Sequence, residues 1–367
     1  MKKNNLIRNI VLALAVLLIS VPGCGKEAAR DNRSSQSDNG TYIASGTLAA
    51  TQGSDNAGYE KLEIKYQGWA GQVTVLELAG DLGYLSPLKL KWMGNTISGP
   101  QDIQATQSGD IDIGGAFMTA IINLIAAKGD IISVTGISSI DGKVSSDVYV
   151  LEDSPIKSGR DLIGKSVSVN TLGAHNEVML KLYLKKEGLT DEEIKRVSLI
   201  VVPPTNAEQA LRSGQVEATF LSGVLKDKAV EKGGVRSLFS DADLVGKATY
   251  SAYVMRKKYL EANPNTSKKL LEGISRAIEW SKETPKEEVI ARMKKIMETR
   301  KRQEDIDSLK YWKSYGCPGK GGLIYDSDVQ IWIDWLVSQK KITEGQFKLS
   351  DIYTNDYNPF KGEPQSK

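Results

Sequence analysis

The sequence has few of the residues that most often carry metal or covalent chemistry. Its 367 residues include one histidine and two cysteines, Cys24 and Cys317. This small number leaves no cluster of cysteine and histidine ligands at the spacings that zinc sites use. The acidic residues are dispersed and form no motif typical of an acid–base pair. These absences disfavour an enzyme, and we expect neither a cofactor nor a metal.

Long apolar runs are equally scarce, and one stands at the N-terminus. Basic residues such as Lys3 and Arg8 precede an apolar run of 12 residues, 10–21. That run is too short to span a bilayer but has the length found in secretory signal peptides. It ends in Val21-Pro22-Gly23-Cys24, which resembles the lipobox of bacterial lipoproteins, whose cysteine is acylated and becomes the new N-terminus. The alternative is an ordinary signal peptide with a chance cysteine.

Cleavage after residue 23 would change the charge and the cysteine count. It removes three basic and no acidic side chains, so 45 of each remain and the formal net charge is zero. A neutral chain does not favour nucleic acid as a partner. With Cys24 acylated, Cys317 has no intramolecular disulfide partner, and we expect it to be a buried thiol.

The segment after the lipobox predicts a membrane tether. Residues 24–58 are rich in Ser, Asn, Gly, Thr and Asp and contain few large apolar residues. Such a composition is typical of flexible linkers. We therefore expect a monomer that is held by lipid on the extracytoplasmic face of the cell membrane, in the periplasm or at the cell surface.

The remaining residues predict an α/β protein. Roughly 300 residues follow from Tyr59, which is too many for one ordinary core and suits two lobes. Apolar periodicity predicts strands over 62–66, 88–93, 111–113 and 131–137, and helices over 73–82, 102–107 and 117–127. This alternation implies a largely parallel sheet covered on both faces. A further apolar stripe, Val329, Trp332, Ile333 and Leu336, has helical spacing and is expected to be core.

A repeated segment supports two lobes of similar build. Residues 104–112, QATQSGDID, match residues 209–217, QALRSGQVE, with four identical positions. Each copy predicts a helix end, a Ser-Gly cap and a strand. The second copy lies in its own series, with capping-box patterns at Thr190/Glu193 and Thr205/Glu208 and a strand over 197–202. Chance similarity of Ser-Gly helix ends is the alternative.

One stretch joins a strand, a glycine turn and a helix that begins beside the only histidine. Residues 167–169 predict the strand, 170–173 the turn, and a helix with one apolar face begins at Ala174. Backbone N–H groups at such a helix start attract an anion or a carbonyl group. His175 lies in the first helical turn, where it either contacts a ligand or makes an ordinary surface contact.

Several motifs occur in the order seen in a known family. They are Tyr66-Gln67, SGDIDIGG at 108–115, DSPIKS at 153–158 followed by DLIGKSV at 161–167, and Gly173-Ala174-His175. Together they resemble the substrate-binding proteins of ABC importers in the nitrate/sulfonate/taurine and thiamine-precursor group. The resemblance covers residues 59–357 and implies a type II periplasmic-binding-protein fold. That fold has two α/β lobes, two crossover segments and one ligand in the cleft between the lobes.

The resemblance also implies a division of the chain. We expect lobe 1 to contain residues 59–149 and 252–367, and lobe 2 to contain residues 150–251. The stretches 148–151 and 250–255 are the expected crossovers. Hinge closure about them would present the loaded protein to an ABC permease.

Ligands of open α/β sheets bind outside the carboxyl ends of strands, which selects the loops 67–71, 114–119, 171–176 and 220–223. In the first and third of these loops, the resemblance assigns ligand contacts to Gln67, Trp69, Thr171, Gly173, Ala174 and His175. The position of the other two loops adds Ala116, Phe117, Met118, Leu221 and Ser222 as expected contacts. Backbone N–H groups near 173–175 would bind oxygen atoms, and Trp69 and Phe117 would form apolar walls.

Two loops depart from the family pattern. The segments AFMT at 116–119 and FLSG at 220–223 are more apolar than the corresponding polar segments of sulfonate binders. None of the four loops contains arginine, the strong donor that a bare inorganic anion usually requires. The expected ligand is therefore a small organic molecule with an apolar body and one polar end.

Three functions can be compared at this point. Capture of a solute for import is the expected one. A surface lipoprotein that binds a protein partner or senses a ligand is the alternative, and it would need an exposed apolar patch. An enzyme on the same fold, such as a thiamine-pyrimidine synthase, would need the cysteine-rich segment that this chain lacks.

Overall fold

The structure is a computed structural model that describes residues 58–302 and 304–364. These residues belong to one compact unit, Ser54–Lys367. The expected signal peptide, the lipidated Cys24 and all of the expected tether except Gly58 lie outside the described residues. Over the described ranges, we find no helix with the length and apolar character needed to cross a membrane.

The N-terminal part of the described chain alternates strands and helices, as expected. Its elements are β1 Glu63–Trp69, α1 Val75–Asp81, β2 Lys89–Thr96, α2 Gly99–Ser108, β3 Gly114–Phe117, α3 Met118–Ala126 and β4 Ile131–Ile137. Strands β1 and β2 form a parallel pair. Strand β10 (Ser251–Arg256) lies between β3 and β4 and is antiparallel to both.

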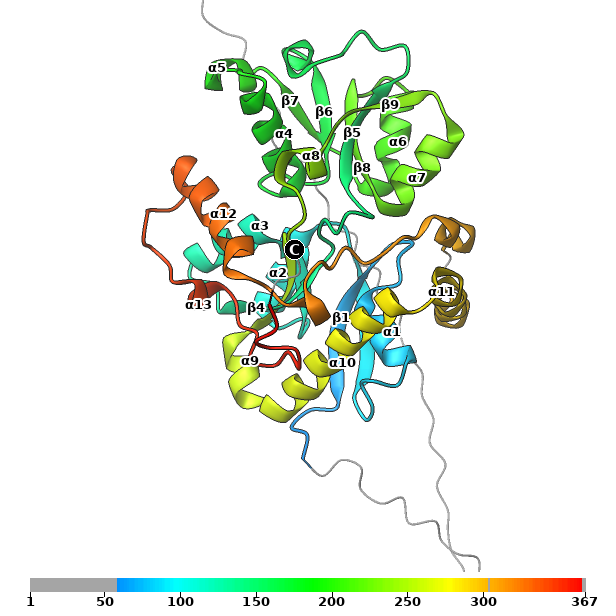
Figure 1. Ribbon diagram of the computed structural model, residues 1–367, viewed down its shortest axis with the longest axis vertical. Coiled ribbons are helices and arrows are strands. Elements are labelled where there is room, and N and C mark those ends of the chain that lie inside the picture. Colours follow the sequence, from blue (N-terminus) through cyan, green and yellow to red (C-terminus); the bar gives the residue numbers. More distant parts are fainter. Residues whose placement is uncertain (1–57, 303, 365–367) are drawn as a thin grey trace, which may run out of the picture. The chain divides into compact units, whose positions relative to one another are not determined.

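The middle of the chain forms a five-stranded sheet in the order β7-β6-β8-β5-β9. Its elements are β5 Ser146–Leu151, η1 Gly159–Leu162, β6 Ser166–Val169, α4 His175–Lys186, α5 Asp191–Ile194, β7 Ser198–Val201, α6 Pro204–Arg212, β8 Ala218–Ser222, α7 Gly223–Lys232, β9 Val235–Ser240 and α8 Asp241–Val245. Strands β7, β6 and β8 are parallel, and β5 is antiparallel to β8 and β9. Figure 1 shows α4 on one side of this sheet and α6 and α7 on the other.

The C-terminal part is mainly helical. Its elements are α9 Lys257–Ala262, α10 Pro264–Glu283, α11 Lys286–Arg300, η2 Ile306–Tyr311, η3 Lys320–Gly322, α12 Asp326–Ser338 and α13 Leu349–Ile352. The predicted apolar stripe on α12 is buried, with Trp332 only 1% exposed, so its assignment to the core is confirmed. Cys317 is also buried, as expected, and donates to the carbonyl of Gly136. Burial raises the pKa of the Cys317 thiol to about 12.

The repeated segment has the same backbone geometry in both copies. In the first copy, Asp112 exchanges two hydrogen bonds with the backbone of Lys65 in β1: its N–H donates to the Lys65 carbonyl, and its carboxylate accepts the Lys65 N–H. In the second copy, Glu217 does the same with Ser166 in β6. The sequence repeat therefore marks a repeated way of attaching a helix–strand connection to the neighbouring strand.

Several expected boundaries are wrong. The strand expected over 111–113 lies instead over 114–117 as β3, where a glycine-containing loop and the start of a helix were expected, because these residues pair with β10. The glycines serve close packing there, since a Cβ at Gly114 would lie 2.5 Å from Thr106 Oγ1. The Thr190/Glu193 capping box is present, whereas α6 begins one residue before Thr205, with proline in its first turn and no side-chain cap.

The stretches expected as crossovers are strands. Residues 148–151 lie in β5 and residues 251–255 lie in β10. The connections between the sheets run through 138–145 and 241–250, and a bridge between Ile140 and Ala248 holds these two segments together. The expected lobe boundaries stay a prediction.

A buried carboxyl group lies behind β3. Asp102 on α2 is 2% exposed, and its Oδ2 accepts the Gly115 N–H at 2.6 Å. Its Oδ1 is buried without a hydrogen-bond partner. Burial raises the pKa of Asp102 to about 7, and the bond from Gly115 offsets only part of that effect.

Replacing Asp102 by asparagine should change the pH dependence of stability. The pKa of Asp102 is about 7 in the folded chain and about 4 when unfolded, so the folded state binds the extra proton between these values. The free energy of unfolding of the wild type should therefore fall as pH rises from 5 to 8, by up to a few kcal/mol relative to Asp102→Asn. Urea unfolding at both pH values measures this difference.

Asp110→Asn is the matched control, because Asp110 is exposed just beyond the end of the same helix. An equal pH dependence for wild type and Asp102→Asn would contradict the assignment.

Candidate functional site

Among the described helices that follow a strand and have no side-chain cap, three start close together. They are α3 after β3, α4 after β6, and α7 after β8, and their N-cap residues are Phe117, Ala174 and Ser222. By contrast, α1 is closed by a capping box between Thr74 and Glu77. The first N–H groups of an uncapped helix are available to an oxygen-bearing ligand, and the helix dipole adds to their attraction.

A chain of contacts brings these three helix starts together. The Phe117 ring contacts the His175 ring edge-on, with 4.7 Å between centroids. His175 Nε2 lies 2.8 Å from Asp241 Oδ2, and Asp241 Oδ1 accepts the Ser146 N–H at 3.0 Å. Ser146 is paired with Ser222 in the β5–β8 ladder. The starts of α3, α4 and α7 therefore surround one region, which we call the candidate site.

The carboxyl end of β1 approaches the same edge. A parallel bridge joins Tyr66 of β1 to Ile113, just before β3. Since the two segments run parallel from this bridge, Gln67 and Trp69 lie beside the strand that leads into α3. Ligand contacts from Gln67 and Trp69 stay a prediction.

Three buried polar atoms at these strand ends have no hydrogen-bond partner. They are Gln67 Oε1, Thr119 Oγ1 and Asn170 Oδ1. Gln67 is in β1, Thr119 is in the first turn of α3, and Asn170 follows β6 directly. Leaving a buried polar group unpaired costs about 1–3 kcal/mol, so such atoms need an explanation. A ligand that hydrogen-bonds to them would provide one.

Thr119 and Asn170 were not among the predicted contacts. Both lie next to residues that were predicted, namely Met118 and Thr171. The sequence signal that could have found them is their place at the carboxyl end of a strand, where a polar residue follows an apolar run.

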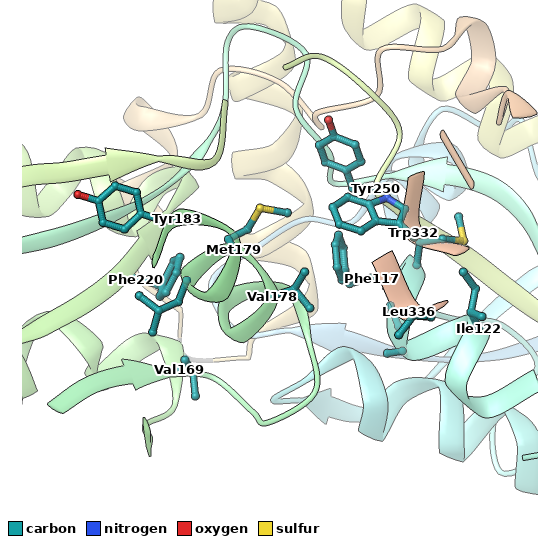
Figure 2. Packing of buried hydrophobic residues seen from close by; sticks show 14 of the residues in the cluster. Phe117, Ile122, Val169, Val178, Met179, Tyr183, Phe220, Tyr250, Trp332 and Leu336 are labelled. Atoms are coloured by element: carbon teal, nitrogen blue, oxygen red, sulfur yellow. The ribbon is translucent and has the colours of Figure 1, made fainter. Parts of the chain in front are cut away.

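His175 has a defined role in the structure. Its ring is 23% exposed, bonds to a carboxylate that is 2% exposed, and packs against Phe117. Figure 2 shows Phe117 next to Trp332, with which it also makes an edge-on contact of 4.7 Å. His175 thus fixes the start of α4, and a ligand contact from it stays a prediction.

One of the predicted N–H donors is already in use. The Gly173 N–H donates to Glu177 Oε2 at 2.8 Å, and Glu177 also pairs with Lys181. The oxygen-binding role expected for residues 173–175 would therefore have to come from Ala174 and His175.

The other predicted contacts differ in exposure. Trp69, Thr171 and Gly173 are partly or largely exposed, whereas Ala116, Phe117, Met118 and Leu221 are buried. Leu221 packs with Leu211 and Val216 in a hydrophobic cluster of the five-stranded sheet. Buried residues of this kind shape the region through packing, and their contact with ligand is untested.

Two arginines that the sequence analysis did not select bond to residues on either side of the loop 67–71. Arg300 donates to the Gln72 carbonyl at 2.9 Å, and Arg302 donates to the Tyr66 hydroxyl at 2.9 Å. Each also pairs with Glu77 at 2.8 Å, and Arg300 pairs with Glu304 as well. Because carboxylates balance both guanidinium charges, the arginines position the loop more than they offer an unpaired cation. Within the described ranges, no three potential ligand residues are grouped to hold a metal ion.

Comparison with known proteins identifies the family. The sequence model described as NMT1/THI5 like matches residues 89–288, more than half of the chain. The chain belongs to the NMT1/THI5-like family. The family resemblance expected from the ordered motifs is confirmed.

Relatives of the NMT1/THI5-like chain confirm its fold. A protein of Brucella abortus, provisionally described as a binding protein, is 24% identical over 269 residues, which cover 71% of this chain and 79% of the relative. The periplasmic aliphatic sulphonate binding protein SsuA from Escherichia coli matches with a TM-score of 0.58 and 24% identity over 77% of this chain and 88% of its own. The periplasmic nitrate-binding protein NrtA from Synechocystis PCC 6803 matches with a TM-score of 0.61 and 13% identity, over 82% and 88%. The chain has the periplasmic-binding-protein fold that was expected.

Two aromatic residues of the candidate site should respond differently to truncation. Phe117 is 5% exposed between His175 and Trp332, whereas Trp69 packs into none of the hydrophobic clusters formed by the described residues. Phe117→Ala should lower the free energy of unfolding by about 3–5 kcal/mol, and Trp69→Ala by about 1 kcal/mol or less. Urea unfolding of both variants tests this. Similar losses would show that Trp69 is a core residue and not a free wall.

Proposed function

We propose that this protein is the substrate-binding component of an ABC importer. It captures a small organic molecule at the candidate site and delivers it to a membrane permease. The observation that carries the proposal is the convergence of three uncapped helix starts, beside strand ends that hold three unpartnered buried polar atoms. Helix-start donors and unsatisfied polar atoms gathered around one region fit a ligand better than they fit a purely structural role.

The chemistry of the site favours a ligand with an oxygen-bearing end. Backbone N–H groups at the starts of α3, α4 and α7 would bind sulfonate, carboxylate or carbonyl oxygens. Gln67, Thr119 and Asn170 would complete the hydrogen bonds, and Trp69 would contact an apolar body. The arginines near the first loop are charge-balanced, so a bare anion such as nitrate fits less well than an organic molecule.

The relatives support this class of function. SsuA is an aliphatic sulphonate binder and NrtA a nitrate binder, and the Brucella relative is provisionally a binding protein. For this chain we propose a sulfonate-, taurine- or thiamine-precursor-like solute, no catalysis, and hinge closure around the ligand as the step that the permease recognises.

We further propose that lipid on Cys24 anchors the protein at the extracytoplasmic membrane face. In a bacterial host, the wild type should incorporate labelled palmitate and sediment with membranes. Cys24→Ala should lose both properties, while Cys317→Ala, the matched control, should keep both. Membrane association and labelling that persist in Cys24→Ala would rule out this anchor.

One feature favours the alternative of a protein-binding lipoprotein. Trp92 and Met93 on the edge strand β2, and Ile97 just after it, are 42%, 44% and 58% exposed. Exposed apolar residues on an unpaired edge are typical of partner-binding surfaces.

A thermal-shift screen separates the two functions. We would test ethanesulfonate, taurine, nitrate, an aromatic carboxylate and an aminopyrimidine at 1 mM. A bound ligand at about 100 times its Kd stabilises the folded state by about 2.7 kcal/mol and should raise the Tm by several degrees. If none of these compounds raises the Tm, the partner-binding alternative is favoured.

Thr119→Val tests the site itself. Valine keeps the shape of threonine but removes a buried hydroxyl that has no partner, so the ligand-free variant should be about 1 kcal/mol more stable than the wild type. The same change should reduce the shift caused by the active compound. Val230→Ala is the control, because Val230 is 48% exposed near the C-terminal end of α7, seven residues after the start of that helix. Unchanged stability and an unchanged shift in Thr119→Val would contradict the site.

A further inference from the structure

A segment between α11 and η3 contacts three separate parts of the molecule. We call residues 304–316, which include η2, the strap. It starts at the loop after β1, passes along α7 of the five-stranded sheet, and ends at the connection between β4 and β5. The three contacts differ in burial, and that difference suggests what the strap does.

The start of the strap is held by a buried, charge-balanced cluster. Glu304 Oε1 accepts the Gly71 N–H at 3.1 Å and pairs with Arg300 through two bonds of 2.6 Å. The Arg300 and Glu304 side chains are 9% and 6% exposed. Arg300 in turn bonds to Glu77 at 2.8 Å. Breaking such a pair would leave a buried charge uncompensated, so this end stays attached.

The end of the strap is fixed to both connections between the sheets. Tyr315 and Gly316 accept hydrogen bonds from the Ser138 and Ser139 N–H groups, at 2.9 and 2.6 Å. The Ser139 hydroxyl also accepts the N–H groups of Tyr250 and Ser251 on the return connection. Gly316 has a φ of 63°, and a Cβ there would lie 2.3 Å from the backbone carbonyl oxygen of Ser139. The close approach of the two backbones therefore depends on glycine.

Three ion pairs, most of whose side chains are exposed, join the middle of the strap to α7. These are Lys228–Asp305 at 2.5 Å, Lys310–Glu231 at 3.2 Å and Lys313–Asp227 at 2.8 Å. Five of the six side chains are between 42% and 59% exposed. Exposed pairs of this kind are worth about 0–1 kcal/mol each and are screened by salt.

We propose that the strap is a salt-sensitive latch on the closed arrangement. Both of its ends are attached to the part of the molecule around β1 and the connections, while its middle pairs with α7, which belongs to the five-stranded sheet. When that sheet moves about the connections, the exposed pairs with α7 separate and the buried contacts remain. High ionic strength therefore favours the open arrangement even without a ligand.

The latch rests on the proposed function only for the hinge motion, so the experiment measures that motion in the ligand-free protein. Spin labels would be placed at Val201→Cys on β7 and Ile331→Cys on α12, both exposed positions. Both labelled variants also carry Cys24→Ala, and the buried Cys317, whose thiol pKa is raised, should not react with the label. Pulsed electron paramagnetic resonance of the full chain then gives the distance distribution at 20 mM and 500 mM NaCl.

The expected result is a short-distance population at low salt that falls roughly five- to tenfold relative to a longer one at high salt, the combined effect of three weak pairs. Lys228→Glu should cause part of this loss at low salt. Adding Asp305→Lys restores an opposite-charge pair and should recover the short distance. Lys195→Glu is the matched control, because its pair with Glu192 lies on α5, away from the strap.

A distribution that is identical at both salt concentrations and in Lys228→Glu would overturn the latch. So would an equal shift in Lys195→Glu, since the effect would then not depend on the strap. Neither outcome bears on the ligand screen, because a compound can raise the Tm of a protein whose lobes close without a latch. A salt-dependent distance in a protein that binds none of the compounds would support the latch and count against the proposed ligand class.

Discussion

The candidate site depends on the two hydrogen bonds of the Asp241 carboxylate. The carboxylate accepts the backbone N–H at the start of β5 and bonds to the ring of His175 at the start of α4. Asp241 is itself the first residue of α8, so one buried group joins three elements. The His175 ring in turn touches Phe117 at the start of α3. This carboxylate therefore links the start of α4 to the start of β5 through hydrogen bonds.

The charged side chains at the candidate site are paired with one another, whereas several neutral polar atoms there have no hydrogen-bond partner. The buried arginines and carboxylates around the first loop are paired with one another. The polar atoms left without partners belong to neutral side chains, and the helix starts supply neutral N–H donors. Such a surface holds a ligand by directed hydrogen bonds and shape, and it selects for geometry more than for charge.

Local patterns predicted much of the fold. The strand over residues 131–137 and the helix that begins beside His175 follow from apolar periodicity and turn residues, and the structure has both. The repeated Ser-Gly segment predicted two units of similar build, and in both copies the acidic residue at its end bonds to the neighbouring strand in the same way. These features depend on residues close in sequence, where periodicity and capping preferences act directly.

What could not be predicted depends on partners far apart in the chain. Strand β3 forms because β10, more than 130 residues later, pairs with it, and no local pattern near Gly114 reports that partner. In the same way, Arg300 and Arg302 reach a loop more than 220 residues earlier. The unpartnered atoms of Thr119 and Asn170 become visible only when every neighbour is in place.

The burial of Cys317 affects how the chain would withstand the export that we propose for it. An exported protein meets oxidants and thiol-exchange enzymes, which act on the thiolate form of cysteine. With a pKa near 12 and a side chain closed off by its neighbours, the Cys317 thiol stays protonated and out of reach. Packing thus protects this cysteine once the chain has folded: it keeps folded copies from being cross-linked to one another through Cys317.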